Sequence, residues 1–505
     1  ALRNSLCNPN NTINALQAYN INAPQVYQQG FGLPGFASSS QRFSAFAQDT
    51  WKIRPNFTLN YGLRYFIQNE ADPIRLDKNN FQPRIGFAWD IFNNAKTVIR
   101  AGAGIFTGQI DNQITNVVNT LASGTEPYNI NIVVAAANLP GSYSSVFIYQ
   151  TLLAQGVIGQ RQIVASDLTQ FGLNTGPGRP LEARIRIGEN FQNPETYQVS
   201  AAIQQDLGRG FSAEASYLFT RGIHLVRPVD VRDYAVAGIS PFTGTPIVAA
   251  TEVAQYNIPG VPVPVTLPRF ALDAEYQSVA NSFYHAGTLQ IIKRFSRYYS
   301  LNANYTLSKT IDEATDFNTD YLAQDPLNVR GDRSLSAFDQ RHRLVLSAVF
   351  ISPSENAFLR DWVFSPIYTW GSGRPFNLLI GFDTNNDSRL YNDRPAGAGR
   401  NTGRGESYSS FDMRLARRFF AREQRYLELT FEAFNLFNTV NYNGINNVVG
   451  TACVAGFPTN PNCAGASNVI PINARGIKGI SPTAPLGFTS AAPARQLQFG
   501  IRYNF

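Results

Sequence analysis

The sequence has little charge and no long apolar run. Only 15% of its 505 residues are Asp, Glu, Lys or Arg, whereas charged residues make up about a quarter of a typical soluble domain. No run of about 18 apolar residues occurs, so the chain offers no transmembrane helix. The mean hydropathy of −0.18 also excludes a helical membrane protein.

Residues that carry chemistry are scarce and scattered. The three histidines, His224, His285 and His342, lie far apart and lack the spacing of metal ligands. Gly102-Ala-Gly104 precedes no Lys-Ser/Thr pair and is no phosphate loop, and no Ser/His/Asp arrangement has a recognisable context. The net charge of +7 is spread along the chain, which does not indicate nucleic-acid binding. We therefore expect neither an enzyme nor a nucleic-acid partner.

Cysteine and methionine are also rare. Cys453 and Cys463 lie in a loop-like stretch and could form a disulfide in an oxidising compartment, with Cys7 left over. Their spacing does not decide between a disulfide and two free thiols. The only methionine is Met413, and no signal peptide begins at Ala1. We expect a processed product or a fragment of a longer protein.

The chain is rich in segments that alternate apolar and polar residues, as strands with one apolar face do. The clearest is the last, in which Leu497, Phe499, Ile501, Tyr503 and Phe505 share a face. Its aromatic end resembles the final strand of bacterial outer-membrane barrels. We predict an all-β fold with about thirteen strands of the length that such barrels use. They cover residues 43–53, 57–66, 84–92, 99–105, 197–203, 211–219, 281–295, 299–309, 340–350, 360–371, 408–420, 425–437 and 495–505.

The connections between these strands fall into two length classes. Those after odd-numbered strands are short. Most of those after even-numbered strands are long, and they are residues 108–194, 222–280, 310–339, 372–407 and 438–494. Short turns on one side and long loops on the other are typical of an antiparallel transmembrane β-barrel with long extracellular loops. This parity predicts that strand 43–53 runs inward and that the last strand ends on the periplasmic side.

Charged residues occupy the face opposite the aliphatic and aromatic ones. They are Arg64, Arg84, Asp90, Arg100, Glu214, Arg414 and Glu428. In a membrane barrel these side chains face the lumen, but a soluble barrel would invert the two faces, and periodicity does not distinguish them. The aromatics Trp51, Trp89, Trp362 and Tyr426 lie near strand ends and suit membrane-interface belts, with core packing as the alternative. Pro366 lies within a strand and predicts a bulge or a sheet edge.

Seven further stretches, together with the terminal strand, are similar in order and spacing to one known family. They are Phe46-Ala-Gln-Asp-Thr-Trp51, Leu59-Asn-Tyr-Gly-Leu-Arg-Tyr65, Pro83-Arg-Ile-Gly-Phe-Ala-Trp89, Tyr305-Thr-Leu-Ser-Lys-Thr-Ile-Asp312, Phe338-Asp-Gln-Arg-His-Arg343, Gly371-Ser-Gly-Arg-Pro-Phe376 and Phe431-Glu-Ala-Phe-Asn-Leu-Phe-Asn438. The chain resembles the carboxyl-terminal barrel portion of TonB-dependent outer-membrane receptors of the Oar-like type, found in acidobacteria and myxobacteria.

The resemblance implies a barrel of about 22 strands around a plug. Residues 43–505 would then be the carboxyl-terminal part of the barrel, and residues 1–42 an extracellular loop with the end of a preceding strand. The plug, the TonB box and the first strands would lie outside this chain. Because unpaired strand edges are untenable in lipid, we expect a missing amino-terminal part of the same barrel to complete it. The other partners implied are outer-membrane lipid, the TonB–ExbB–ExbD complex acting through the plug, and a surface lipoprotein over the mouth.

Two loops carry candidate ligand sites. Asp383, Asn385 and Asp387 place oxygen atoms at alternate positions, as the first half of a calcium loop does, and Asp393 could add another. Ser388 replaces the usual Gly and Arg394 the usual Glu, so an Asx-rich turn without metal is the alternative. Loop 108–194 contains an apolar run at 130–137 and a helical pattern near 146–157. It either encloses a ligand over the barrel mouth or packs on its neighbours.

These observations leave three functions open for a protein of the bacterial outer membrane. The first is TonB-dependent transport of a bound ligand, a carbohydrate, a peptide or a metal chelate, although relatives have also been associated with protein export. The second is a structural or adhesive surface barrel whose long loops contact other cells. The third is a passive porin, which needs no plug. A soluble all-β protein is the remaining alternative.

Overall fold

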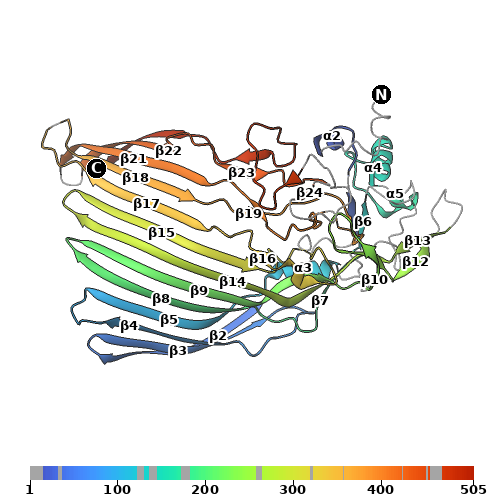
Figure 1. The fold of residues 1–505 in the computed structure, drawn as a ribbon, viewed down its shortest axis with the longest axis horizontal. Coiled ribbons are helices and arrows are strands. Elements are labelled where there is room, and N and C mark those ends of the chain that lie inside the picture. Colours follow the sequence, from blue (N-terminus) through green and yellow to red (C-terminus); the bar gives the residue numbers. More distant parts are fainter. Residues whose placement is uncertain are drawn as a thin grey trace.

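The computed structural model describes residues 15–24, 26–31, 37–121, 130–135, 145–171, 182–256, 264–318, 322–356, 358–389, 391–422, 425–450, 453–454 and 469–504. Its framework is a curved, antiparallel sheet in which long strands follow one another in chain order (Figure 1). The strands of this meander are β2 (Gln41–Arg54), β3 (Phe57–Asn69), β4 (Phe81–Asp90), β5 (Thr97–Thr107), β8 (Glu195–Gly208), β9 (Phe211–Asp230), β14 (Phe270–Ser296), β15 (Tyr299–Asp312), β17 (His342–Ile351), β18 (Trp362–Gly371), β21 (Tyr408–Arg422), β22 (Arg425–Phe434) and β27 (Gln496–Asn504). Each segment that the alternation predicts as a strand overlaps one of them.

The remaining elements are short and lie in the connections or, for α2 and β1, before β2. The helices are α2 (Ala15–Asn20), α3 (Asn112–Leu121), α4 (Ser145–Ala154), α5 (Ala165–Thr169) and the 3-10 turn η3 (Val329–Asp332). The short strands are β1 (Val26–Phe31), β6 (Ile130–Ala135), β7 (Glu182–Ile187), β10 (Tyr234–Ile239), β11 (Pro246–Ala250), β12 (Val253–Tyr256), β13 (Val265–Pro268), β16 (Ser334–Leu335), β19 (Pro375–Phe376), β20 (Gly403–Arg404), β23 (Tyr442–Ile445), β24 (Cys453–Val454), β25 (Val469–Ile470) and β26 (Phe488–Ala491). None of the helices in the described ranges is long and apolar enough to cross a membrane.

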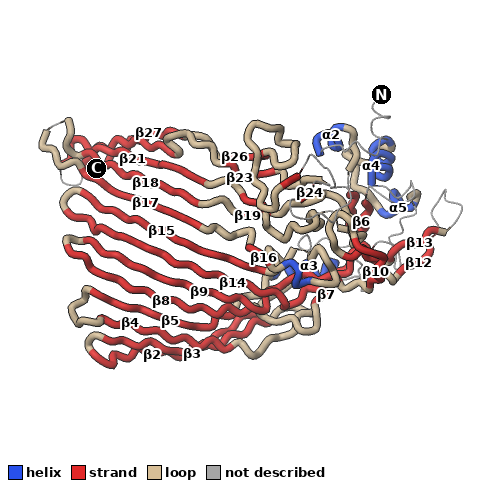
Figure 2. Tube along the Cα trace, viewed as in Figure 1, coloured by secondary structure: helices blue, strands red, loops and turns tan. Residues whose placement is uncertain are grey.

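Short turns and long loops lie at opposite ends of the sheet, as the connection lengths predict. The turns at 55–56, 91–96, 209–210, 297–298 and 352–361 lie at one end, where the described chain also finishes (Figure 2). The other end carries the connections 70–80, 108–194, 231–269, 313–341, 372–407 and 435–495. We refer to these six connections, as far as the structure describes them, as the loop layer.

The predicted loop 222–280 is too long at both ends. Strand β9 continues to Asp230 and β14 begins at Phe270, and the two remain paired up to the partners Asp230 and Ala274. The register between them shifts near Gln277 and Ala280. Such bulges break the alternation of side chains, so the sequence pattern ends where the bulges begin although the strands continue. The loop itself is residues 231–269.

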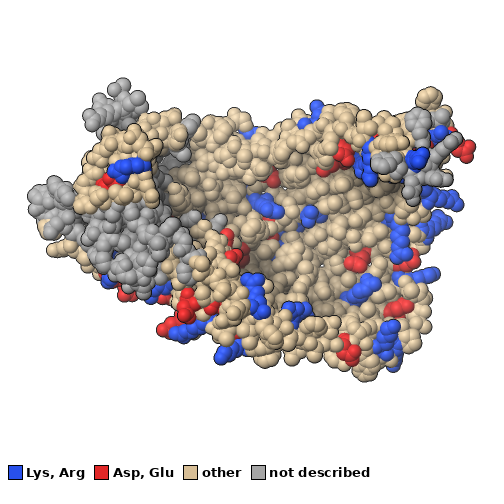
Figure 3. Space-filling model, turned by 180° about the vertical axis from the view of Figure 1, so that it is seen from behind, with Lys and Arg blue, Asp and Glu red and all other residues tan. Residues whose placement is uncertain are grey.

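The apolar face of the sheet is the outer one. Phe499 and Ile501 of β27 are 78% and 77% exposed, and Leu289 of β14 is 60% exposed. The seven charged residues named in the sequence analysis lie at the positions between the outward-facing ones, and therefore on the inner face of the sheet. Figure 3 shows Lys, Arg, Asp and Glu side chains within the hollow of the sheet. An apolar surface of this extent is compatible with lipid rather than with water.

The prediction for Pro366 is wrong. Strand β18 has partners on both sides, and Pro366 stands opposite Met413 of β21 without a register shift. On the β17 side the pairing passes from Ser347–Ile367 to Phe350–Phe364 in one register. Proline has no N–H to donate, so the ladder skips the pairs around it, and the strand needs neither a bulge nor an edge.

Three of the four interface aromatics lie where the sequence predicts, and Tyr426 does not. Trp51 and Trp89 are exposed on the outer face near the short turns, and Trp362 shares that face with the Arg417 guanidinium, which lies 5.5 Å from its ring. Tyr426 is in register with Asn504, on the hollow face, with the Arg418 guanidinium 4.6 Å from its ring. Its position in the alternation, not its position near a strand end, determines its face.

The two faces should respond differently to the same new charge. Leu289→Arg places a guanidinium on the lipid side and should destabilise the protein by about 2–4 kcal/mol. Gln290→Arg, one residue away, points into the hollow opposite Glu214 and should have a much smaller effect. Urea unfolding of the full-length protein in lipid measures both. Equal losses for the two variants would contradict the assignment of the faces.

Candidate functional site

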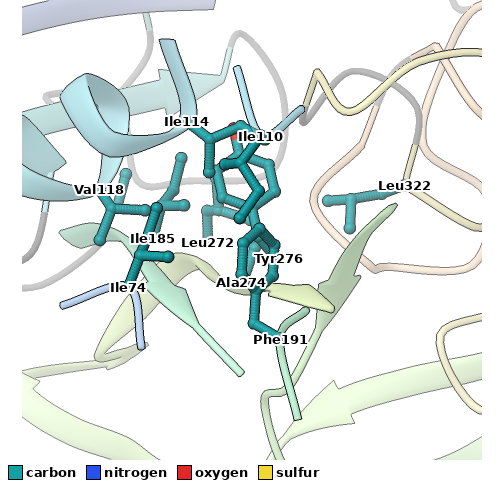
Figure 4. Close-up of a cluster of buried hydrophobic side chains, with 11 residues drawn as sticks. Ile74, Ile110, Ile114, Val118, Ile185, Phe191, Leu272, Ala274, Tyr276 and Leu322 are labelled. Carbon is teal, nitrogen blue, oxygen red and sulfur yellow. The ribbon is translucent and has the colours of Figure 1, made fainter. Parts of the chain in front are cut away.

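Among the described residues, a cluster of buried apolar side chains lies where the loop layer meets the end of the sheet. It joins Ile74 of loop 70–80, Ile114 and Val118 of α3, Ile185 of β7 and Tyr276 of β14 (Figure 4). Helix α3 presents Ile114 and Val118 one turn apart, so both reach the same face. Because these residues come from segments far apart in the chain, the core fixes loop 108–194 to the strands at the loop end of the sheet.

Loop 108–194 packs on its neighbours, as one of the two sequence hypotheses states. The apolar run forms β6, which pairs antiparallel with β1, and the helical pattern forms α4. The Ser145 hydroxyl donates to the Pro24 carbonyl over 2.6 Å. Residues 15–31 therefore lie against this loop. Enclosure of a ligand by the same loop stays a prediction.

A buried carboxylate, Asp332 of loop 313–341, joins loop 372–407 to strand β9. Its oxygens accept hydrogen bonds from Arg227 Nη2 at 2.8 Å and from Arg394 Nη2 at 2.5 Å. Arg400 Nε donates to the Asp332 carbonyl over 2.8 Å, and Arg400 also pairs with Asp312. All of these side chains are buried. Ion pairs removed from water in this way hold one arrangement of the loops, because a lost partner leaves a buried charge uncompensated.

Residues 383–388, the acidic turn, are held by the loops on both sides. The Val248 N–H donates to the Asn385 carbonyl over 2.7 Å, and Asn386 Nδ2 donates to the Val248 carbonyl over 2.9 Å. From loop 313–341, the Gln324 carbonyl accepts from Asn385 Nδ2 at 2.7 Å. The turn is therefore a point where loops 231–269, 313–341 and 372–407 meet.

The predicted calcium ligands do come together in this turn, but most of their oxygens already have donors. The Asp383 carboxylate accepts from the Asn386 and Ser388 N–H groups at 2.6 and 2.8 Å. Asp387 accepts from the Arg389 N–H and from Asn392 Nδ2, both at 2.8 Å. Asp393 folds back so that its Oδ2 accepts from the Thr384 N–H at 2.5 Å. The twelfth position, Arg394, instead pairs with Asp332.

The carboxylates of Asp383 and Asp387 in the turn and of Asp393 beside it repel one another in a buried place. Burial, followed by the negative charges of Asp383 and Asp393, raises the pKa of Asp387 to about 8. Burial and the charge of Asp383 raise the pKa of Asp393 to about 6. Asp393 Oδ1 and Asn392 Oδ1 are buried and have no hydrogen-bond partner in the part of the chain that the structure describes. Three carboxylates thus lie close together, partly offset by the Arg389 and Arg394 guanidinium groups, beside two oxygens that have no hydrogen-bond partner among the described residues.

Metal binding is not assigned by the structure. Within the described ranges, no group of three or more His, Cys, Asp and Glu side chains is placed to hold a metal ion, and the sequence hypothesis relied on Asn385 as well. Calcium at Asp383, Asn385 and Asp387 stays a prediction. Cys463 and Cys7 lie outside the described ranges. The disulfide between Cys453 and Cys463 therefore stays a prediction.

Two of the histidines have structural partners on the outer face of the sheet. The Tyr217 hydroxyl lies 2.7 Å from His285 Nδ1, and the Tyr305 hydroxyl lies 2.8 Å from His342 Nδ1. His342 begins β17, at the loop end of the sheet.

The hollow face carries paired polar side chains along several strands. Glu428 accepts from Arg414 Nη2 at 3.0 Å and from Arg418 Nε at 2.9 Å. Arg100 Nη1 donates to Gln204 Oε1 over 2.8 Å. This face can therefore contact water or a polar protein segment, which an apolar face could not do.

Sequence reasoning missed the Asp332 cluster. Its members, Arg227, Asp332, Arg394 and Arg400, come from three separate segments, and no local pattern links them. The only local signal was a high density of Arg, Asp and Asn in these loops.

Asp332→Asn should loosen the loop layer while leaving the sheet intact. The change leaves Arg227 and Arg394 without a buried counter-charge, and removal of one partner from a buried pair typically destabilises by about 3–5 kcal/mol. Limited proteolysis of the full-length protein should then cut the loops at least ten times faster. Glu252→Gln breaks the exposed pair with Arg269 and is the matched control, with an expected effect of about 0–1 kcal/mol. Equal proteolysis of the two variants would contradict the role of Asp332.

The chain resembles several solved outer-membrane proteins over most of its own length. The outer membrane transporter YddB from Escherichia coli is 13% identical, with 92% of this chain and 45% of that chain covered and a TM-score of 0.48. A mutant of the ferric enterobactin receptor PfeA from Pseudomonas aeruginosa is 13% identical, with 94% and 47% covered and a TM-score of 0.47. The siderophore receptor PirA from Acinetobacter baumannii is 10% identical, with 92% and 46% covered and a TM-score of 0.45. This chain spans less than half the length of each of the three.

Sequence comparison gives the family. No match is found among curated proteins. A family model described as an outer membrane beta barrel domain matches residues 3–72, 68–399 and 396–464, which is most of the chain. The apolar outer face and the segregation of turns from loops agree with this match. The chain belongs to the outer membrane beta barrel domain family and is a protein of the bacterial outer membrane.

Proposed function

We propose that this chain is the carboxyl-terminal barrel portion of an Oar-like, TonB-dependent receptor. In this proposal the loop layer binds a ligand outside the cell, and TonB-transmitted force on a plug admits the ligand through the barrel. The short turns would lie in the periplasm. The ligand class, a carbohydrate, a peptide or a metal chelate, stays open.

The observation that carries the proposal is the packed loop layer at one end of a sheet with a polar hollow face. An apolar core and the buried ion pairs of Asp332 hold the loops in one arrangement. A preorganised surface of this kind loses little entropy when it binds a ligand. A hollow lined by charged and amide side chains supports a lumen that holds a polar plug.

The open sheet supports the presence of further strands. Strand β2 pairs with β3 and β27 pairs with β22, and neither has a second strand partner within the described ranges. Two open edges in lipid leave backbone N–H and C=O groups without hydrogen bonds, at several kcal/mol for each group. We therefore propose that a further segment pairs with both edges and closes a barrel of about 22 strands.

Two other functions compete with this one. A passive porin would conduct without a plug, which the tightly packed loops disfavour. A structural or adhesive barrel would use the loops only to contact other cells. Support for a receptor over an adhesin comes from the buried ion pairs of Arg227, Arg394 and Arg400, which hold the loops in one arrangement, as a ligand-binding surface requires.

We also propose that calcium neutralises the acidic turn. The support is the close grouping of the Asp383, Asp387 and Asp393 carboxylates, together with Asp393 Oδ1 and Asn392 Oδ1, which lack hydrogen-bond partners among the described residues. Ser388 has a φ of +66°, the left-handed conformation that the sixth position of a calcium loop supplies with Gly. Carboxylate and amide oxygens are the ligands that calcium prefers.

Uptake by whole cells tests the transport proposal. Cells that carry the full-length gene should accumulate one of three labelled pools, oligosaccharides, oligopeptides or ferric chelates, in a saturable way. A protonophore should abolish accumulation, because TonB-dependent transport needs the proton gradient. Uptake that survives the protonophore indicates a porin. No uptake, with loss of cell aggregation on deletion of the gene, indicates an adhesin.

Calcium should stabilise the loop layer through the acidic turn. At a calcium concentration about a hundred times the Kd, binding contributes about 2.7 kcal/mol, and thermal unfolding of the full-length protein should shift upward. Asp387→Asn should remove most of this shift. Asp325→Asn alters an exposed loop carboxylate that accepts from the Leu327 N–H and should leave the shift unchanged. A protein that unfolds identically with calcium and with a chelator would contradict the site.

A further inference from the structure

Cations gather on the outer face of the sheet at its loop end. Two guanidinium groups, those of Arg221 and Arg333, each lie 5.4 Å from the centroid of the Phe283 ring of β14. One step along the same face, Lys309 of β15 stands opposite His285 of β14. We name Arg221, Lys309 and Arg333, with Phe283 and His285, the outer basic band.

The side chains of this band share the face that carries the exposed aliphatic residues. Phe283 and His285 lie on the same face of β14 as Leu289, which is 60% exposed. Arg221 stands opposite Phe283, and Lys309 stands opposite His285. Positions directly opposite in neighbouring strands lie on one face, so the band points outward and not into the hollow.

The height of the band matches one surface of the bilayer. Arg221 lies ten residues beyond Phe211, where β9 begins, and Lys309 lies ten residues beyond Tyr299, where β15 begins. Ten residues span about 34 Å along a strand. At the usual barrel tilt of about 40° this rises by about 25 Å, which is the height of the apolar band of an outer-membrane barrel. The cations therefore lie at the level of the lipid headgroups.

Among the described residues these cations have no anionic partner. Within the described ranges none of Arg221, Lys309 and Arg333 forms an ion pair with Asp or Glu. Glu195 on the neighbouring strand β8 instead accepts a hydrogen bond from the Tyr197 hydroxyl at 3.2 Å. Two guanidinium groups on one ring repel each other, and an anion bound by both would offset that repulsion.

We infer that the outer basic band binds the phosphate groups of a phosphorylated outer-leaflet glycolipid. Arg is the residue best suited to bidentate phosphate contacts. Phe283 and the His285–Tyr217 pair supply the apolar surface against which the upper acyl chains of such a lipid lie. The inference rests on the proposed orientation, in which the short turns are periplasmic, and it is independent of the transported ligand.

Lipid binding by two charge-matched variants tests the inference. The full-length protein in nanodiscs is titrated with diphosphorylated lipid A and with dephosphorylated lipid A, and bound lipid is counted by native mass spectrometry. The wild type should bind the phosphorylated form at least tenfold more tightly, and Arg221→Gln/Arg333→Gln should lose about tenfold or more of that binding. High salt should weaken the wild-type interaction.

The control removes two cations from the opposite rim of the same face. Lys293 and Arg417 lie near the short turns, beside Tyr299 and Trp362, so Lys293→Gln/Arg417→Gln should leave lipid A binding unchanged. Retained heat-modifiable migration shows that each variant is folded. Equal binding of both lipids by the wild type overturns the inference. A loss of lipid A binding confined to the control variant overturns both the inference and the proposed orientation. Failure of the uptake test affects neither the inference nor the orientation.

Discussion

The outer face of the sheet meets lipid, which offers no hydrogen bonds, and the rest of the structure depends on that constraint. Every backbone N–H and C=O in the membrane must find its partner in a neighbouring strand. This explains the uninterrupted meander and also why Pro366 is accommodated by a skipped pair in an otherwise regular ladder. It also places charge only where it is hydrated or paired, in the hollow, at the rims and in the loops.

The loop layer lies in water, where hydrogen-bond partners are abundant, so it needs other interactions to hold one conformation. It does so with an apolar core around Tyr276 and with buried ion pairs around Asp332. The two devices act together, since the core excludes water and the lower polarity strengthens the ion pairs. The acidic turn is the exception, because its like charges oppose the packing unless protons or a cation neutralise them.

Sequence reasoning succeeded where the physics is local and failed where it is not. Alternation located the strands because each side chain's face follows from its neighbour's. It failed at the bulges of β14, which shift the alternation, and at Tyr426, whose position near a strand end suggested an interface belt. The residues around Asp332 could not be found in this way, because they come from three segments that only the folded chain brings together.

The sequence by itself determined the strand positions, the two classes of connection and the existence of one apolar and one polar face. These follow from the period of two and from the lengths between the strands. Only the tertiary structure decided that the apolar face is the outer one, because outside and inside are properties of the curvature of the whole sheet. It alone placed the loops against one another, since their contacts join residues up to a hundred or more positions apart.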